Sequence, residues 1–276
     1  MSYRSTSASF LMGMSLCLGL VGASPAEEVK KSGPPSLNDL SLDIAALETL
    51  YYLRATPAQK EKLRDLAEET ADRSGVRQAA KASDKFRHTM ADLRLALLKE
   101  EDKRVEELAK QLEDLRKAEN PELDDGVEIT DEARERASEA LRLLTPGQVA
   151  GYVGAYAESI PDPLEQLLEA LDKVRDLKPD EWKDLRDILS DEVGWLVAGL
   201  DEEQASKVGD QVVQLLIMAR ALKEEDFQKQ RPDLEKKARK IVGQVGPTDV
   251  LRHFLERSLA ELLSNPRLQT VLDAQN

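Results

Sequence analysis

Aromatic residues are scarce in this chain. They make up 4% of its 276 residues, whereas hydrophobic residues as a whole reach 41% and charged residues 33%. Strands favour aromatic and β-branched side chains, so a chain with so few rings is a poor candidate for a β-sandwich. A mixture of aliphatic and charged residues suits helices that have one apolar face. The sequence therefore predicts an all-α protein built of elongated helical hairpins or a helical bundle.

Positive charge is also in deficit. The chain has 39 Lys and Arg residues against 53 Asp and Glu residues, which gives a formal net charge of −14. Nucleic acids and anionic membrane surfaces bind proteins through clustered Lys and Arg side chains. We therefore expect neither of them as a partner.

Cysteine and histidine are nearly absent, since the chain has only Cys17, His88 and His253, and no G-x-S-x-G, H-E-x-x-H or glycine-rich phosphate loop occurs. A structural zinc needs about four ligands, so both histidines are expected to be exposed helix residues. The acidic loop over residues 122–128 lacks the alternating oxygen ligands of a calcium site. These absences predict no metal, no cofactor and no enzymatic activity, although a carboxylate pair acting as acid and base stays open.

The N-terminal segment differs in composition from the rest of the chain. Residues 1–26 contain one charge, at Arg4, followed by an apolar run over residues 10–21 and small residues over 22–26. This order is typical of a secretory signal peptide, and the apolar run is shorter than the roughly 20 residues that span a bilayer. We expect export to the periplasm or another extracytoplasmic compartment, with an uncleaved anchor as the alternative.

Two cleavage positions fit the signal-peptide pattern, one after Ala23 and one after Ala26. Either of them removes Cys17 and leaves a mature chain with no cysteine and no transmembrane segment. Residues 27–35 end in Gly-Pro-Pro and are expected to form a linker.

Capping patterns mark the starts of several helices. Three segments place a capping residue three positions before a glutamine, and two of them have proline at the first helical position. These segments are Thr56-Pro57-Ala58-Gln59, Thr145-Pro146-Gly147-Gln148 and Asp201-Glu202-Glu203-Gln204. Ser36 and Thr130 are further expected N-caps, and Gly75 is expected to end the helix that starts at Pro57.

No glycine or proline interrupts residues 76–118. Two apolar stripes occur there, separated by a step of eight residues between Leu97 and Val105, one more than a heptad. We predict one long helix whose stripe shifts near residues 100–102, with a hairpin at that point as the alternative.

Tyr51 and Tyr52 are adjacent on the first predicted helix. Neighbouring helix residues point about 100° apart, so both rings cannot face the core. We predict that one of them contacts solvent or a protein partner. The remaining aromatic residues are expected to pack at helix crossings, because rings bury a large area.

Short sequence patterns of the first half of the chain recur in the second half. Four short matches occur in the same order, among them Pro57 with Pro179 and the acidic triplet around Glu101 with that around Glu225. Order of this kind indicates an internal duplication. The predicted repeats cover residues 36–158 and 161–276, and the second differs by Pro232, which is expected to kink or split its long helix.

The Thr-Pro-x-Gln segments at Thr56 and Thr145, and the segment at Asp201, resemble the Leu-Thr-x-x-Gln motif of the periplasmic LTXXQ family, the Spy and CpxP type. Ala55 stands where that motif has leucine, and Asp201 stands where it has threonine. The resemblance implies an exported all-helical protein with long bent hairpins that acts as an ATP-independent chaperone or envelope-stress protein.

These observations together predict an exported helical module that binds protein clients or an envelope protein, and they leave a homo-oligomer open. A structural or scaffolding envelope protein with one specific folded partner is the alternative. An apolar groove is expected for the first function and not for the second.

Overall fold

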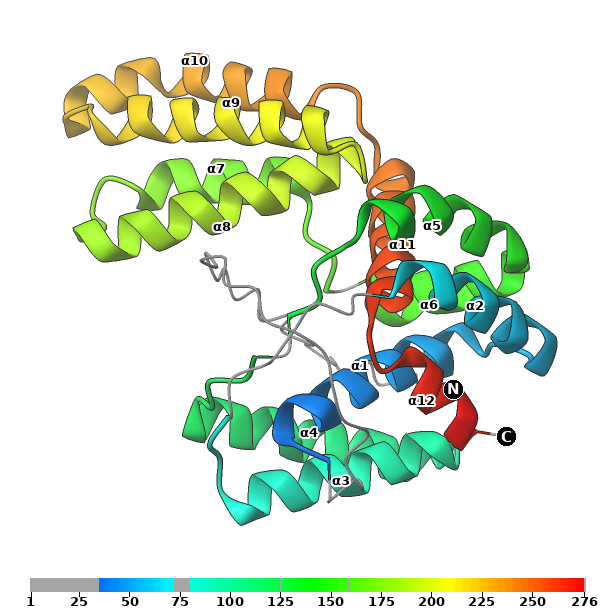
Figure 1. Ribbon diagram of the computed structural model, residues 1–276. Helices are drawn as coiled ribbons and strands as arrows, with labels where there is room; N and C mark the ends of the chain where they lie inside the picture. Colours follow the sequence, from blue (N-terminus) through cyan, green and yellow to red (C-terminus); the bar gives the residue numbers. More distant parts are fainter. Residues whose placement is uncertain (1–34, 72–79, 125, 158, 276) are drawn as a thin grey trace, which may run out of the picture. The chain divides into compact units, whose positions relative to one another are not determined.

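The computed structural model describes residues 35–71, 80–124, 126–157 and 159–275. Within these ranges the regular structure consists of twelve α-helices and no strand (Figure 1), so the prediction of an all-α fold is confirmed. None of the described helices combines the length and hydropathy required to cross a membrane. The predicted signal peptide, most of the predicted linker, and Gly75 lie outside the described residues.

The chain divides into two compact units, Met1–Gly151 with Ala260–Asn276, and Tyr152–Leu259. The helices of the first unit are α1 (Leu37–Leu53), α2 (Pro57–Thr70), α3 (Asp84–Leu98), α4 (Asp102–Glu119), α5 (Asp131–Leu143), the first part of α6 (Pro146–Tyr156), the end of α11 (Pro247–Ser264) and α12 (Leu268–Ala274). The second unit contains α7 (Pro163–Lys173), α8 (Pro179–Ala198), α9 (Glu202–Arg220), α10 (Glu224–Val242) and most of α11.

Helix α1 is the centre of the first unit. It packs against α3 and α12, while α3 packs against α4, and α2 against α5 and α12. Residues on nearly every side of α1 are buried, among them Leu42, Leu47 and Leu53. A helix that is apolar on most of its surface needs neighbours on several sides, and this explains its central place.

A buried carboxylate joins three parts of the first unit. Asp43 on α1 is 0% exposed, and it accepts hydrogen bonds from Arg94 Nε on α3 at 2.6 Å and from Arg267 Nε, just before α12, at 2.8 Å. A carboxylate without water needs such partners, because burial of an unpaired charge is costly. The pair of arginines therefore positions α3 and α12 around α1.

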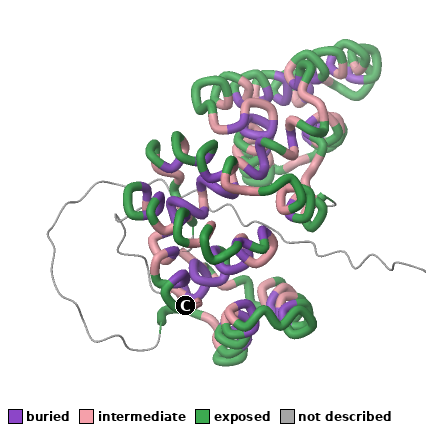
Figure 2. The backbone as a smooth tube through the Cα atoms, turned by 90° about the vertical axis from the view of Figure 1, so that its right-hand side faces the viewer, coloured by how far each residue is buried: buried purple, intermediate pink, exposed green. Residues whose placement is uncertain are grey.

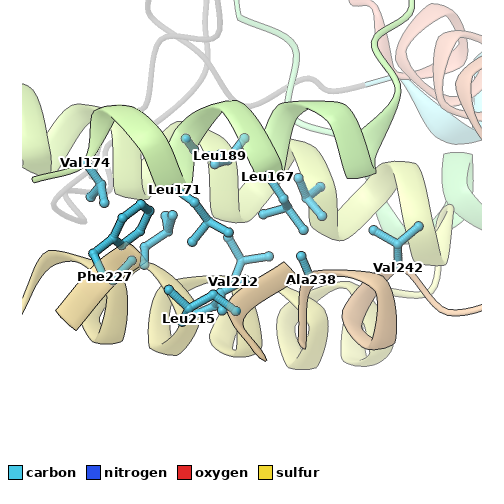
Figure 3. Close-up of a cluster of buried hydrophobic side chains, with 14 residues drawn as sticks. Leu167, Leu171, Val174, Leu189, Val212, Leu215, Phe227, Ala238 and Val242 are labelled. Carbon is cyan, nitrogen blue, oxygen red and sulfur yellow. The ribbon is translucent and has the colours of Figure 1, made fainter. Parts of the chain in front are cut away.

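The second unit has an apolar core made by its first four helices. Figure 3 shows Phe227, Leu167, Leu171, Val212 and Leu215 converging from α7, α9 and α10. Figure 2 shows that buried and exposed residues alternate along the backbone within each helix. Each helix of the unit thus contributes one apolar face and leaves a polar face in water.

Helices α8 and α9 approach each other closely. A Cβ atom added at Gly194 would lie 2.7 Å from the carbonyl oxygen of Ala205, and one at Gly209 would lie 3.0 Å from that of Ser190. Only a residue without a side chain permits this separation of two backbones. The glycines therefore set the spacing of the α8–α9 hairpin.

The predicted long helix over residues 76–118 is wrong, and the alternative hairpin is correct. Helix α3 ends at Leu98, α4 begins at Asp102, and Glu100 between them adopts the left-handed conformation with φ of 54°. The buried residues of the two helices include Phe86, Met90, Leu93 and Leu97 on α3, and Val105, Leu108 and Leu112 on α4. A hairpin buries both apolar stripes, whereas a straight helix would leave one of them in water.

The expected split of the second repeat's long helix at Pro232 is wrong, because α10 continues from Glu224 to Val242. Proline has no N–H, so Pro232 cannot donate the helical hydrogen bond to the carbonyl of Gln228, four residues earlier. Both residues are exposed, so water can donate to that carbonyl instead. The described part of α2 ends at Thr70, before the expected stop at Gly75.

The histidines differ from each other. His88 is exposed, as predicted, but His253 is buried with 8% of its surface exposed. Its Nδ1 atom lies 2.9 Å from the carbonyl oxygen of Leu196, and its ring contacts the position that a Cβ atom would take at Gly199. The end of α8 therefore turns at a glycine with φ of 65°, where His253 leaves no room for a side chain.

The aromatic residues of the second unit pack together, in line with the prediction. Tyr152 and Tyr156 of α6 and Trp195 of α8 surround Phe254 of α11, with ring centroids 5.5 to 6.4 Å from that of Phe254. Tyr152 and Trp195 are buried. Trp182 is half-buried, with the guanidinium of Arg220 5.1 Å from its ring centroid.

Candidate functional site

The two Thr-Pro-x-Gln segments form the capping boxes that the sequence predicts. The amide N–H of Gln59 donates to Thr56 Oγ1 at 3.3 Å, and the N–H of Thr56 donates to Gln59 Oε1 at 2.9 Å. Thr145 and Gln148 repeat both bonds at the same distances. Pro57 and Pro146 occupy the first positions of α2 and α6.

Gln59 and Gln148 also pair with each other across the first unit. The Nε2 atom of each amide lies 2.9 Å from the Oε1 atom of the other. Gln59 Nε2 donates further to the carbonyl of Leu143 at 2.6 Å, and Gln148 Nε2 donates to that of Arg54 at 3.1 Å. Arg54 lies two residues before Thr56, and Leu143 lies two residues before Thr145, so each glutamine binds the carbonyl that precedes the other segment. The arrangement therefore has local two-fold symmetry. These hydrogen bonds join the α1–α2 turn to the α5–α6 turn.

The third segment lies in the second unit and makes a simpler cap. Asp201 Oδ1 accepts from the N–H of Gln204 at 3.0 Å. Within the described part of the chain, the Gln204 side chain makes no hydrogen bond and is exposed. This segment therefore starts α9 without the cross-link that the other two share.

Tyr51 and Tyr52 are both half-buried, with ring centroids 5.2 Å apart in an edge-to-face arrangement. The Tyr51 hydroxyl donates to Asp102 Oδ1, at the start of α4, at 2.5 Å. Burial and this hydrogen bond raise the pKa of Tyr51, and burial with the nearby Glu48 raises that of Tyr52. Tyr51 thus fastens α1 to α4, and parts of both rings stay in contact with solvent.

Glu48 lies on the same helix, α1, with 5% of its surface exposed. Burial raises the pKa of its carboxyl to about 8, and the positive charge of Arg116 offsets only part of this shift. The carboxyl forms no hydrogen bond or ion pair in the described ranges, and it is therefore mainly protonated at neutral pH.

The candidate binding site is a groove of about 300 Å³ between α9 and α10, in the second unit. Leu215, Met218 and Ile241 form its apolar floor, and the other lining residues are Asp210, Gln211, Gln214, Lys237 and Lys240. Met218 is 38% exposed, and its neighbour Ile217 on α9 is 45% exposed. We refer to this feature as the α9–α10 groove.

Positive charge borders the α9–α10 groove. Lys237 and Lys240 line it, and the Nζ atom of Lys237 lies 3.4 Å from Met218 Sδ. Lys236 and Arg239 are exposed on the same turns of α10. None of these four cations forms an ion pair with another described residue, and Asp210 is the only carboxylate among the lining residues. The groove is therefore cationic in a chain whose net charge is −14.

The sequence analysis did not identify this groove. Two signals for it exist, namely the adjacent apolar residues Ile217 and Met218 and the basic run over residues 236–240. Neither signal shows by itself which helices pack together, because the groove forms only where α9 and α10 pack side by side.

No group of three or more His, Cys, Asp or Glu side chains among the described residues is arranged to hold a metal ion. Comparison of the chain with protein-family models, with curated proteins and with solved structures finds no match.

Proposed function

We propose that this protein is an exported, helical protein-binding module that captures unfolding clients without nucleotide, as an ATP-independent chaperone or envelope-stress protein. The α9–α10 groove carries the proposal, because it is open and Met218, which lines it, is accessible to a partner. Apolar side chains exposed in a groove can be covered by the apolar residues of a partner.

Capture and release would depend on affinity alone. Burial of one side chain such as Met218 contributes about 1.5–3 kcal/mol, which is sufficient for reversible binding and too little for a permanent complex. Methionine is unbranched and adapts to different partner surfaces. The net charge of −14 keeps a protein with an exposed apolar groove soluble.

The paired glutamines support the proposed membership of the LTXXQ family. The resemblance rests on the segments that contain Gln59 and Gln148, and these two side chains contact each other as well as capping their own helices. A motif that only capped single helices would need no such contact.

We further propose that the chain arose by duplication of a six-helix repeat. In support, α1–α6 lie within residues 36–158 and α7–α12 within residues 161–276. Pro57 and Pro179 both start the second helix of their half, and Glu101 and Glu225 both lie at the start of the fourth. The compact units divide the chain at other places, since Ala260–Asn276 belongs to the first unit. Alignment of related chains would test the duplication through shared positions in the two halves.

The chaperone function is tested by light scattering of a chemically denatured client during dilution. We expect the mature chain to delay aggregation at near-stoichiometric ratio and without nucleotide. Met218→Glu should reduce this effect, whereas Leu95→Glu, the same change at an exposed apolar residue of α3, should not. An aggregation rate that stays unchanged with excess protein would exclude the chaperone function.

A scaffolding protein with one folded partner is the second candidate. It is favoured by the small number of exposed large apolar side chains in the described ranges, namely Leu95, Ile188, Ile217 and Met218. A scaffold should leave the aggregation of a general client unchanged and bind one native partner.

Export is tested separately by N-terminal sequencing of the protein from its source cells. We expect a mature chain that begins near Glu27 and is located outside the cytoplasm. An intact chain from Met1 recovered in the cytosol would contradict export.

A further inference from the structure

We propose that the α9–α10 groove binds an acidic amphipathic helix, with apolar residues along one face and Asp or Glu residues beside them. This inference rests on the proposed protein-binding function and specifies the chemistry of the segment that is bound.

The charge around the groove selects an acidic partner. Lys237 and Lys240 stand on its α10 side without an ion pair to another described residue, and Lys236 and Arg239 add further positive charge nearby. Carboxylates of a bound segment can reach these ammonium groups while its apolar residues cover Met218 and Ile241. A basic segment would meet repulsion at the same positions, even though the whole chain is acidic.

The spacing along the groove fits a helix. Gln211, Leu215 and Met218 follow one another at i, i+4 and i+7 on α9, a distance of about 10 Å along the helix axis. A partner helix presents its own apolar residues with the same periodicity, and this is the usual way in which an amphipathic helix occupies a groove. Two turns of such a helix match the length of this row of lining residues.

Other occupants match the groove less well. The apolar run over residues 10–21 of this chain has no acidic residue to face the lysines. A nucleic acid would satisfy the lysines but would leave the floor of Leu215, Met218 and Ile241 uncovered. An anionic bilayer is the remaining source of negative charge with apolar groups, and the experiment below includes it.

The probe is a fluorescein-labelled peptide of about four helical turns, with leucine at i, i+3, i+4 and i+7 and glutamate on the flanking positions. A second peptide has lysine in place of every glutamate. We expect saturable binding of the acidic peptide by fluorescence anisotropy, with weaker binding as the salt concentration rises. The basic peptide should bind weakly or not at all, and anionic phosphatidylglycerol vesicles should not compete with the acidic peptide.

The decisive comparison uses two double variants with the same change of net charge on the same helix. Lys237→Glu with Lys240→Glu reverses the two lysines that line the groove, and we expect it to weaken acidic-peptide binding by on the order of tenfold or more. Lys236→Glu with Arg239→Glu reverses two exposed cations that do not line it, and it should have a clearly smaller effect. Met218→Ala should also weaken binding, and circular dichroism verifies that each variant is folded.

Equal loss of binding in the two double variants would assign the effect to net charge and would overturn the proposal. So would tighter binding of the basic peptide, or displacement of the acidic peptide by the vesicles. The aggregation assay separates this result from the proposed function. If the acidic peptide binds but the protein does not delay aggregation, the chaperone function is rejected and the groove remains a peptide-binding site. If the protein delays aggregation equally well with and without the Lys237→Glu and Lys240→Glu changes, the chaperone function stands and only the role of the groove is rejected.

Discussion

The side-chain amides of Gln59 and Gln148 exchange two hydrogen bonds of 2.9 Å, although the residues are 89 positions apart in the sequence. Each Oε1 atom also accepts from the N–H of its own N-cap threonine. Both amides are part-buried, so loss of one removes two hydrogen bonds from its partner, one donated and one accepted. The pair therefore couples two helix starts that a capping analysis treats as independent.

We expect Gln148→Ala to destabilise the protein by about 2 kcal/mol, because the substitution removes one side of a capping box and the contacts with Gln59 and Arg54. Thr145→Ala removes only the cap and should cost about 1 kcal/mol. Chemical denaturation measures both values. A double-mutant cycle with Gln59→Ala should give a coupling energy on the order of 1 kcal/mol, and strictly additive effects would show that the two amides do not stabilise each other.

Gly194→Ala should destabilise the second unit by about 2–3 kcal/mol or more, since the new Cβ atom would lie 2.7 Å from the backbone oxygen of Ala205 and would force α8 and α9 apart. Gly151→Ala is the matched control. No atom lies within 4 Å of a Cβ at that helical position, so alanine should be neutral or stabilise the helix by up to about 1 kcal/mol. Thermal unfolding of the two variants compares them directly, and equal midpoints would contradict the close helix contact.

Glu48 should make stability depend on pH. Its folded pKa of about 8 lies above the ordinary value of 4.5, so the folded state keeps a proton that the unfolded chain releases between these values. Below about pH 4.5 the carboxyl is protonated in both states and burial has little cost. Stability should then fall as pH rises towards 8, by a few kcal/mol in total.

Glu48→Gln cannot ionise and should remove this dependence. We expect the stability of the variant relative to the parent protein to increase from about pH 5 to about pH 9, measured by denaturation midpoints at each pH. Glu61→Gln provides the matched control, because it makes the same substitution at an exposed position of α2. A parallel pH profile for Glu48→Gln and the parent would show that the carboxyl stays solvated.

Asp43→Asn should destabilise the first unit by about 3 kcal/mol, because it leaves Arg94 and Arg267 without their shared carboxylate. Asp273 also pairs with an arginine, Arg64 at 3.1 Å, but its side chain is 73% exposed. Asp273→Asn should therefore cost less than about 0.5 kcal/mol. Denaturant titration distinguishes the two, and similar losses would mean that water replaces the arginines around Asp43.

Local features of the fold were predictable from the sequence. The caps at Ser36, Thr56, Thr130 and Thr145 all form, because an N-cap bond joins residues only three positions apart. The all-α class was predictable from composition and from apolar periodicity, because both are also local properties of the sequence. The break between α3 and α4 at Glu100 was not the predicted structure. The hairpin is stabilised by contact between the apolar stripes of the two helices, whereas a continuous helix is favoured by local propensity alone.

The features that involve distant residues were decided by tertiary packing. His253 was expected on an exposed helix face, but packing of α11 against the end of α8 buries it. The sequence by itself determined where several of the helices start, how their apolar faces run and that the chain is strongly acidic. Only the tertiary structure paired Gln59 with Gln148 and placed Lys237 and Lys240 beside Met218, because such contacts depend on which helices meet, and helical periodicity does not specify partners.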